Sequence, residues 1–140
     1  MRPHALTLAT VLGLSACATG GLQPFVAPLS PEAASKAAYD MAAFVGQQTR
    51  PSNGPIAVLH PPGDTVLWPL VADDLRTAGY TVTDGQAAHH LRFAVISLPD
   101  GTVLRARLDT VSLAQLYHAE PTGMLAPSGP ATILSDGADE

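Results

Sequence analysis

The stretch His89–Val111 reads "HHLRFAVISLPDGTVLRARLDTV", and its pattern decides the fold class. Two β-prone runs flank the turn sequence "LPDGT" at 98–102. Proline presets φ for a turn and glycine adopts positive φ freely, so this spacing predicts a β-hairpin. A two-residue loop of Asp100 and Gly101 would need an N–H group at Pro99, which proline lacks. We therefore predict a three-residue loop with Gly101 in the left-handed region.

This loop fixes the predicted register, because successive side chains of a strand point to opposite faces. The first face is apolar and suits burial against helices, although Arg92 falls on it opposite Leu108. Its apolar members are Ala94, Ile96, Leu98, Leu104, Ala106 and Leu108. The opposite face mixes apolar and charged side chains, namely Leu91, Phe93, Val95, Val103, Arg105, Arg107 and Asp109.

The mixed face has two interpretations. Long arginine side chains can simply cover apolar neighbours with their methylene groups. Alternatively, the face docks another protein, since aromatic residues and arginine are favoured at interfaces and lysine is not. The docking hypothesis assigns protein contacts to Phe93, Arg105 and Arg107.

Two amphipathic helices are expected before the hairpin. The first covers residues 30–48, because Ser30 can act as N-cap and apolar residues recur at i, i+3 and i+4. Its stripe consists of Ala34, Ala37, Ala38, Met41, Phe44, Val45 and Gln48. The second lies within 64–79, where Asp64 can cap and Gly79 can end the helix. Pro69 requires that this helix either begins near Leu67 or kinks.

Further strands are expected around these helices. The apolar run "PIAVLH" (55–60) predicts a central strand buried on both faces, and "YTVT" (80–83) predicts another. Residues 112–119 fit a strand or a short helix, and we favour a strand. The prolines, glycines and acidic end of 121–140 predict an extended tail whose last five residues are disordered.

The amino-terminal segment has the charge order of a secretory signal. A positive charge precedes the 12-residue apolar run 5–16, which is shorter than the roughly 17–25 residues of a membrane span. The run ends in a sequence that resembles a bacterial lipobox, Leu14-Ser15-Ala16-Cys17. That resemblance implies cleavage before Cys17 and its acylation, with palmitate-type chains. The alternatives are an ordinary signal peptide cut after Ala16 and a buried core cysteine. Lipidation accounts best for a lone cysteine in an exported protein.

The order of these elements predicts an α+β fold: two helices packed on a small, mostly antiparallel sheet with a C-terminal β-hairpin. It divides the chain into a signal peptide (1–16), a lipidated flexible tether (17–29), the α+β domain (30–120) and the tail (121–140).

Composition and motifs limit the function classes. The formal net charge of −5 disfavours nucleic acid or an anionic membrane surface as a direct partner. The sequence has no nucleophile elbow, Walker loop or zinc-protease motif. Adjacent His89 and His90 point to opposite faces of a strand, so they cannot hold one metal ion by themselves. A metal site would need His60 and His118 to join one of them, with a carboxylate such as Asp64 to complete it. We expect no metal, no cofactor and no enzymatic activity.

Taken together, these segments resemble the TrbH lipoproteins of bacterial conjugative transfer systems. The resemblance is carried by the lipobox, "AASKAAYDMAAFV", "ADDLRTAGYTVTDG", "LRFAVISLPDGTVLRARL", "LAQLY" and "PSGPATIL". It implies a lipid-anchored component of the mating-pair-formation apparatus, a type IV secretion machine. Such a component faces the periplasm and contacts other channel proteins.

The resemblance assigns a role to Cys17 alone, as the lipid-attachment site, and Ala18 after it implies sorting to the outer membrane. The alternative is a periplasm-facing lipoprotein that binds or assembles other proteins outside conjugation.

Overall fold

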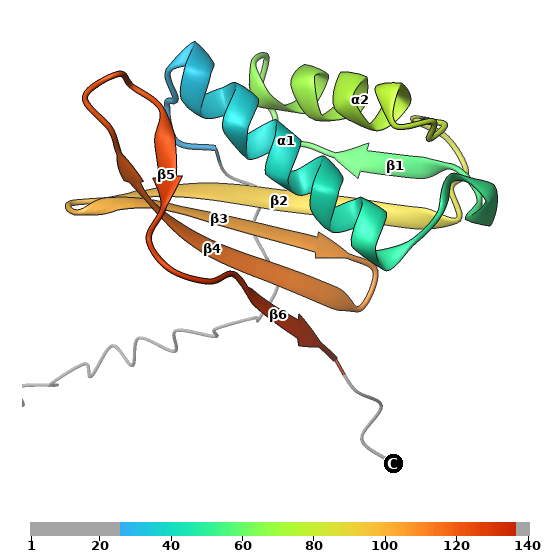
Figure 1. The fold of residues 1–140 in the computed structure, drawn as a ribbon. Helices are drawn as coiled ribbons and strands as arrows, with labels where there is room; N and C mark the ends of the chain where they lie inside the picture. The colour runs from blue at the N-terminus through green and yellow to red at the C-terminus, as the bar shows by residue number, and fades with distance from the viewer. Residues whose placement is uncertain (1–25, 137–140) are drawn as a thin grey trace, which may run out of the picture.

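The computed structural model describes residues 26–136, which form two helices above a six-stranded, mostly antiparallel sheet (Figure 1). The elements are α1 Pro31–Gln48, a 3₁₀ turn Pro51–Asn53, β1 Ile56–Leu59, α2 Leu67–Thr77, β2 His89–Leu98, β3 Gly101–Leu108, β4 Val111–Ala119, β5 Leu125–Pro127 and β6 Thr132–Ser135. The sheet runs β1-β2-β3-β4-β5, and β6 pairs with β4. The β1–β2 pair is parallel and the others are antiparallel. The predicted α+β class is confirmed.

Helix α1 begins and packs as its sequence predicts. The Ser30 hydroxyl caps it by accepting a hydrogen bond from the N–H of Ala33 at 3.1 Å. The same hydroxyl donates to the carbonyl of Gly123 at 2.9 Å, which ties the start of the helix to the β4–β5 connection. The predicted stripe is buried at Ala34, Ala37, Ala38, Met41, Phe44 and Val45, whereas Gln48 is half-buried. Helix α1 therefore presents an apolar face to the core.

Helix α2 begins near Leu67, which confirms the first of the two alternatives for Pro69. The Asp64 carboxylate accepts hydrogen bonds of 2.9–3.1 Å from the N–H groups of Val66, Leu67 and Trp68. Pro69 then falls in the first turn, where a missing N–H costs nothing. The helix ends at Thr77, two residues before Gly79, whose φ of +95° suits glycine. The N–H of Tyr80 then returns to the carbonyl of Leu75 at 3.0 Å.

The sequence predicts that strand β1 is central, but this prediction is wrong because β1 lies at the end of the strand order. Its outer side is met by a single bridge between Ile56 and Val82, and this bridge is all that forms of the predicted strand 80–83. The short connection from α2 to β2 leaves only residues 81–83 beside Ile56, bonded at 2.8 and 3.0 Å. The predicted strand over 112–119 is confirmed as part of β4.

The ordered domain begins before the predicted boundary at Ser30. Val26 bridges Val95 of β2, the N–H of Ala27 donates to the Val95 carbonyl at 2.9 Å, and Ala27 is only 3 % exposed. Because β1 pairs with β2 only over 89–92, residues 26–27 cover the β2 edge beyond it. Residues 26–27, which the sequence analysis assigns to the tether, therefore pair with the sheet.

The signal peptide, the lipobox and the rest of the predicted tether lie outside the described residues, as do the last four residues. Within 26–136, neither helix is long and apolar enough to cross a bilayer.

The predicted hairpin forms, but its register is shifted by one residue. Leu98 pairs with Gly101, so the loop consists of Pro99 and Asp100 alone. Because Pro99 lies in this loop and not in the ladder, its missing N–H costs no hydrogen bond between the strands. The prediction of a three-residue loop did not consider this two-residue alternative. Gly101 pairs within the strand and does not adopt the predicted positive φ.

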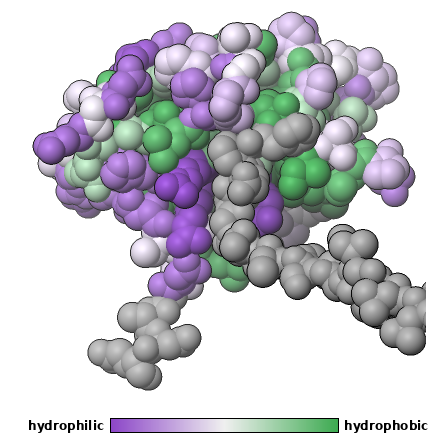
Figure 2. Space-filling view, turned by 180° about the vertical axis from the view of Figure 1, so that it is seen from behind, coloured by the Kyte–Doolittle hydropathy of each residue, from purple (hydrophilic) through white to green (hydrophobic). Residues whose placement is uncertain are grey.

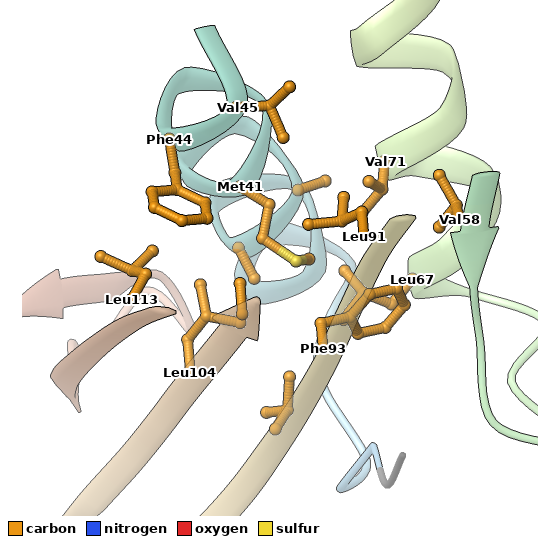
Figure 3. Packing of buried hydrophobic residues seen from close by; sticks show 14 of the residues in the cluster. Met41, Phe44, Val45, Val58, Leu67, Val71, Leu91, Phe93, Leu104 and Leu113 are labelled. Atoms are coloured by element: carbon orange, nitrogen blue, oxygen red, sulfur yellow. The ribbon is translucent and has the colours of Figure 1, made fainter. Parts of the chain in front are cut away.

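A one-residue shift exchanges the two faces of β2 relative to β3. Phe93 now pairs with Ala106 and Val95 with Leu104, and all four side chains are buried. Figure 3 shows Phe93 on the helix side of the sheet, close to Leu67 of α2 and within the main hydrophobic cluster. The residues of β3 that were predicted to face the core do so. For β2 the prediction of which residues face the core is wrong.

Candidate protein-interaction surface

Both helices lie on one face of the sheet, and within 26–136 no helix covers the other face (Figure 1). We call this second face the arginine face. It consists of the side chains on the side of β2, β3 and β4 that faces away from the helices, among which Ala94 is itself buried. These are Arg92, Ala94, Ile96 and Leu98 of β2, Val103, Arg105 and Arg107 of β3, and Ser112, Ala114 and Leu116 of β4. From behind, hydrophobic and strongly hydrophilic residues both reach the surface, as Figure 2 shows.

The arginine face has a cationic end and an apolar end. Its three arginines are a large share of the seven lysine and arginine residues in the chain, and no aspartate or glutamate is among its ten members. At the apolar end, Ile96 pairs with Val103 and Val103 with Leu116, which is 42 % exposed. Such a mixture of exposed arginine and aliphatic side chains is typical of a protein interface.

The cationic end places Arg92 directly opposite Arg107. Like charges at facing positions destabilise a sheet unless an anion lies near them. Arg107 has local acceptors: its Nε donates to the Asp109 carbonyl at 2.8 Å, and its Nη2 donates to the Asp136 carboxylate. Within 26–136, Arg92 and Arg105 make no ion pair.

The predicted docking residues are therefore separated by the observed register. Phe93 is fully buried in the core, so its assignment to the docking face is wrong. Arg105 and Arg107 do share one face, and Arg92 joins them there. Sequence reasoning missed Arg92 because the predicted register turned it toward the core. The cost of burying an unpaired charge was the available signal against that register.

A second polar cluster joins the end of α1 to the β3–β4 turn. His89 Nδ1 lies 2.6 Å from a carboxylate oxygen of Asp109, and His89 Nε2 lies 3.3 Å from the hydroxyl of Thr49. Asn53 donates to the same hydroxyl at 3.0 Å, and the N–H of His90 donates to Asp109 at 3.0 Å. Although hydrolases use a hydroxyl, an imidazole and a carboxylate in this order, Thr49 is only 7 % exposed and already bonded twice. We assign this cluster a structural role.

The pKa of Asp109 offers a test of that role. Burial by itself raises this pKa, but hydrogen bonds from His89 and from the N–H of His90, with the charges of both histidines, lower it below 3.8. A carboxylate with a lowered native pKa stabilises the fold above its unfolded pKa, and this stability is lost as pH falls through the native value. We expect Asp109→Asn to be less stable than wild type at about pH 6, with the gap closing toward about pH 2.5 in urea-unfolding experiments. A gap that is constant with pH would contradict an ionised Asp109 in the cluster.

Within the described residues, His60 and His118 each contact a different partner. The His60 ring stacks on Trp68 with centroids 4.6 Å apart, and His118 Nδ1 lies 2.9 Å from the Ser128 hydroxyl. Across residues 26–136, no three histidine, cysteine or acidic side chains are grouped so that they could hold a metal ion.

A cavity of about 590 Å³ lies between residues 26–29 and the loop that precedes α2. Most of its lining is apolar, and the single titratable lining residue among those described, Asp64, spends its carboxylate on capping α2. Apolar contact is therefore the main interaction that its described lining offers.

Comparison with protein families matches the conjugal transfer protein TrbH over residues 19–137. No curated protein and no solved structure matches the chain. The matched region contains every described helix and strand, together with the whole arginine face. It also covers most of the 140 residues. The chain belongs to the TrbH family of conjugal transfer proteins.

Proposed function

We propose that this chain is an outer-membrane-anchored lipoprotein of the conjugal transfer apparatus, which faces the periplasm and acts by contacts with other envelope proteins of the channel. The observation that carries this proposal is the TrbH match over residues 19–137. A TrbH protein is a component of conjugal transfer. The anchor, the membrane and the mode of action are the proposed parts.

The anchor is Cys17, which follows a charged and then apolar leader in the lipobox-like sequence Leu14-Ser15-Ala16. Residues 18–25 separate it from the first described residue, and a chain of that length spans at most about 30 Å. A lipid on Cys17 would therefore keep the domain close to the membrane surface, where it could meet other envelope proteins.

The contact surface is the arginine face. Its exposed Arg92 and Arg105 and its exposed Leu98 and Leu116 are available to a partner within the described structure. The alternative is that the arginine side chains merely cover their apolar neighbours. The unpaired state of Arg92 and Arg105 within 26–136 favours docking, because a purely structural charge gains from a local counter-ion.

Replacing Cys17 by Ser tests the anchor and the role together. Each buried methylene contributes about 0.8 kcal/mol, and two or more acyl chains hold a protein stably on a membrane. We expect the variant to leave the outer-membrane fraction, to remain uncleaved or become soluble, and to reduce DNA transfer by about tenfold or more because its local concentration at the channel falls. Immunoblots of membrane fractions and mating assays measure these effects.

Thr19→Ser is the matched control, since it makes a similarly small change just beyond the lipobox. It should leave both fractionation and transfer unchanged. A Cys17→Ser protein that is processed, stays in the outer membrane at normal levels and supports full transfer would refute the proposed anchor.

A further inference from the structure

We infer that the arginine face binds an acidic amphipathic segment of a partner protein, a segment in which carboxylates stand beside apolar side chains. This inference rests on the proposed function, because it names the chemistry of the partner at the same surface.

Charge complementarity supports carboxylates in that segment. Arg92 faces Arg107 across the β2–β3 pair, and Arg105 stands in the next row of the same face. Arg107 already holds one carboxylate, that of Asp136, at the border of the face. Arg92 and Arg105 hold none within 26–136, and a guanidinium binds a carboxylate through two parallel hydrogen bonds. The face therefore has the donors for at least one further carboxylate.

The apolar end of the face defines the other part of the segment. Val103 follows Arg105 on the same face at a distance of two strand residues, about 7 Å. Ile96 and Leu116 flank Val103 on the neighbouring strands. An extended segment of about four residues spans both ends of the face, with apolar side chains at one end and carboxylates at the other.

A protein segment fits this surface better than an anionic membrane does. The face has no lysine, which is the cation that protein interfaces disfavour relative to arginine. The chain as a whole carries a formal net charge of −5, which opposes approach to a surface of the same sign. A membrane is therefore one of the outcomes that the experiment distinguishes.

The experiment uses the full-length protein in neutral detergent and fluorescent peptides as probes. The acidic amphipathic probe is Leu-Leu-Leu-Gly-Glu-Glu-Glu-Glu, and two variants of it replace all glutamates by glutamine or all leucines by serine. Anisotropy titrations at about 50 and 300 mM NaCl give affinities with weak and strong screening. We expect the acidic amphipathic probe to bind at least tenfold more tightly than either variant, and more weakly at high salt.

Two double variants of the protein locate the binding. Arg92→Glu with Arg105→Glu should weaken binding of the acidic probe by at least tenfold while the melting temperature stays within a few degrees, because both side chains are exposed. Arg50→Glu with Arg76→Glu changes the net charge equally at positions outside the face and should change the affinity less than twofold. Equal losses in both double variants would overturn the inference, because they would show a general charge effect.

The same measurements distinguish two other ligands of the arginine face, an anionic membrane and the acidic end of this chain. The protein could bind phosphatidylglycerol vesicles but not the acidic probe, and the Arg92→Glu with Arg105→Glu variant could abolish that binding. This result would show that the face binds an anionic membrane and not a partner protein. Probe binding that appears only after removal of residues 137–140 would make the acidic end of this chain the occupant. If no probe binds while Cys17→Ser still removes the protein from the outer-membrane fraction and reduces transfer, the arginine face does not bind an acidic segment and the proposed function is unaffected.

Discussion

Replacing Phe93 by alanine is expected to lower the free energy of unfolding by about 3–5 kcal/mol, a large part of the stability of a domain of this size. Phe93 is fully buried between β2 and the helices, so its loss removes apolar contacts and leaves a cavity that the close-packed core fills only in part. Urea unfolding followed by circular dichroism measures this change, with the slope of the transition checked against wild type.

Arg92→Ala is the matched control, because Arg92 is the preceding residue of the same strand and points to the other face. Substitutions at exposed positions change stability by about 0.5 kcal/mol or less, and removal of one of two facing positive charges adds no cost. The register predicted from the turn alone places Arg92 on the core side and Phe93 outside. With that register, Arg92→Ala would be the more destabilising of the two substitutions. An Arg92→Ala variant less stable than Phe93→Ala would therefore support that register against the observed one.

The helices could be predicted from the sequence because their signals are local. Ser30 caps α1 within three residues of its own position, and Asp64 does the same for α2. The stripe that includes Met41 and Phe44 is buried because its spacing matches the helical repeat. In each case the residues that decide the structure lie within one or two turns of it.

The register of the hairpin could not be predicted from its turn alone. The run Ala94-Val95-Ile96 is apolar at successive positions, so alternation does not say which side of β2 faces the core. The turn chemistry of Pro99 and Gly101 then fitted two loop lengths. The position of Arg92 could have decided between the two loop lengths, since only the shorter loop keeps its charge in solvent.

The place of β1 in the sheet depends on contacts far apart in the chain. Its apolar sequence predicts burial, and Ile56 and Val58 are indeed buried. That burial comes from the helices and from the chain around Val82 rather than from a paired strand on each side. The pairing of Val26 with Val95 is equally remote in sequence and carries no local signal. For the candidate site, the mixture of arginine and apolar residues in the hairpin indicated a protein interface. Which of these residues share one face depends on the register of β2 and β3, which the sequence analysis predicted wrongly.

Gly101→Ala is expected to lower the free energy of unfolding by about 3 kcal/mol, at the upper end of the range for overpacking. An added Cβ at Gly101 would lie 2.2 Å from the carbonyl oxygen of Tyr117, and 3.3 Å from its carbonyl carbon. These are backbone atoms of β4, so relief of the clash requires the β3–β4 ladder to move. Gly85→Ala is the control, because its added Cβ meets only a side-chain atom, the Thr83 hydroxyl oxygen, at 3.6 Å, and we expect a change of about 0.5 kcal/mol or less.

Gly101→Asn separates this cause from the one that the turn sequence suggested. If Gly101 were needed for a left-handed bulge, asparagine would restore much of the stability, since it tolerates positive φ better than alanine does. In the observed hairpin Gly101 has no positive φ, and asparagine brings the same Cβ toward Tyr117 with more atoms behind it. Gly101→Asn should therefore be at least as unstable as Gly101→Ala in urea. An asparagine variant that is clearly the more stable of the two would mean that the loop has three residues and that the arginine face must be redrawn.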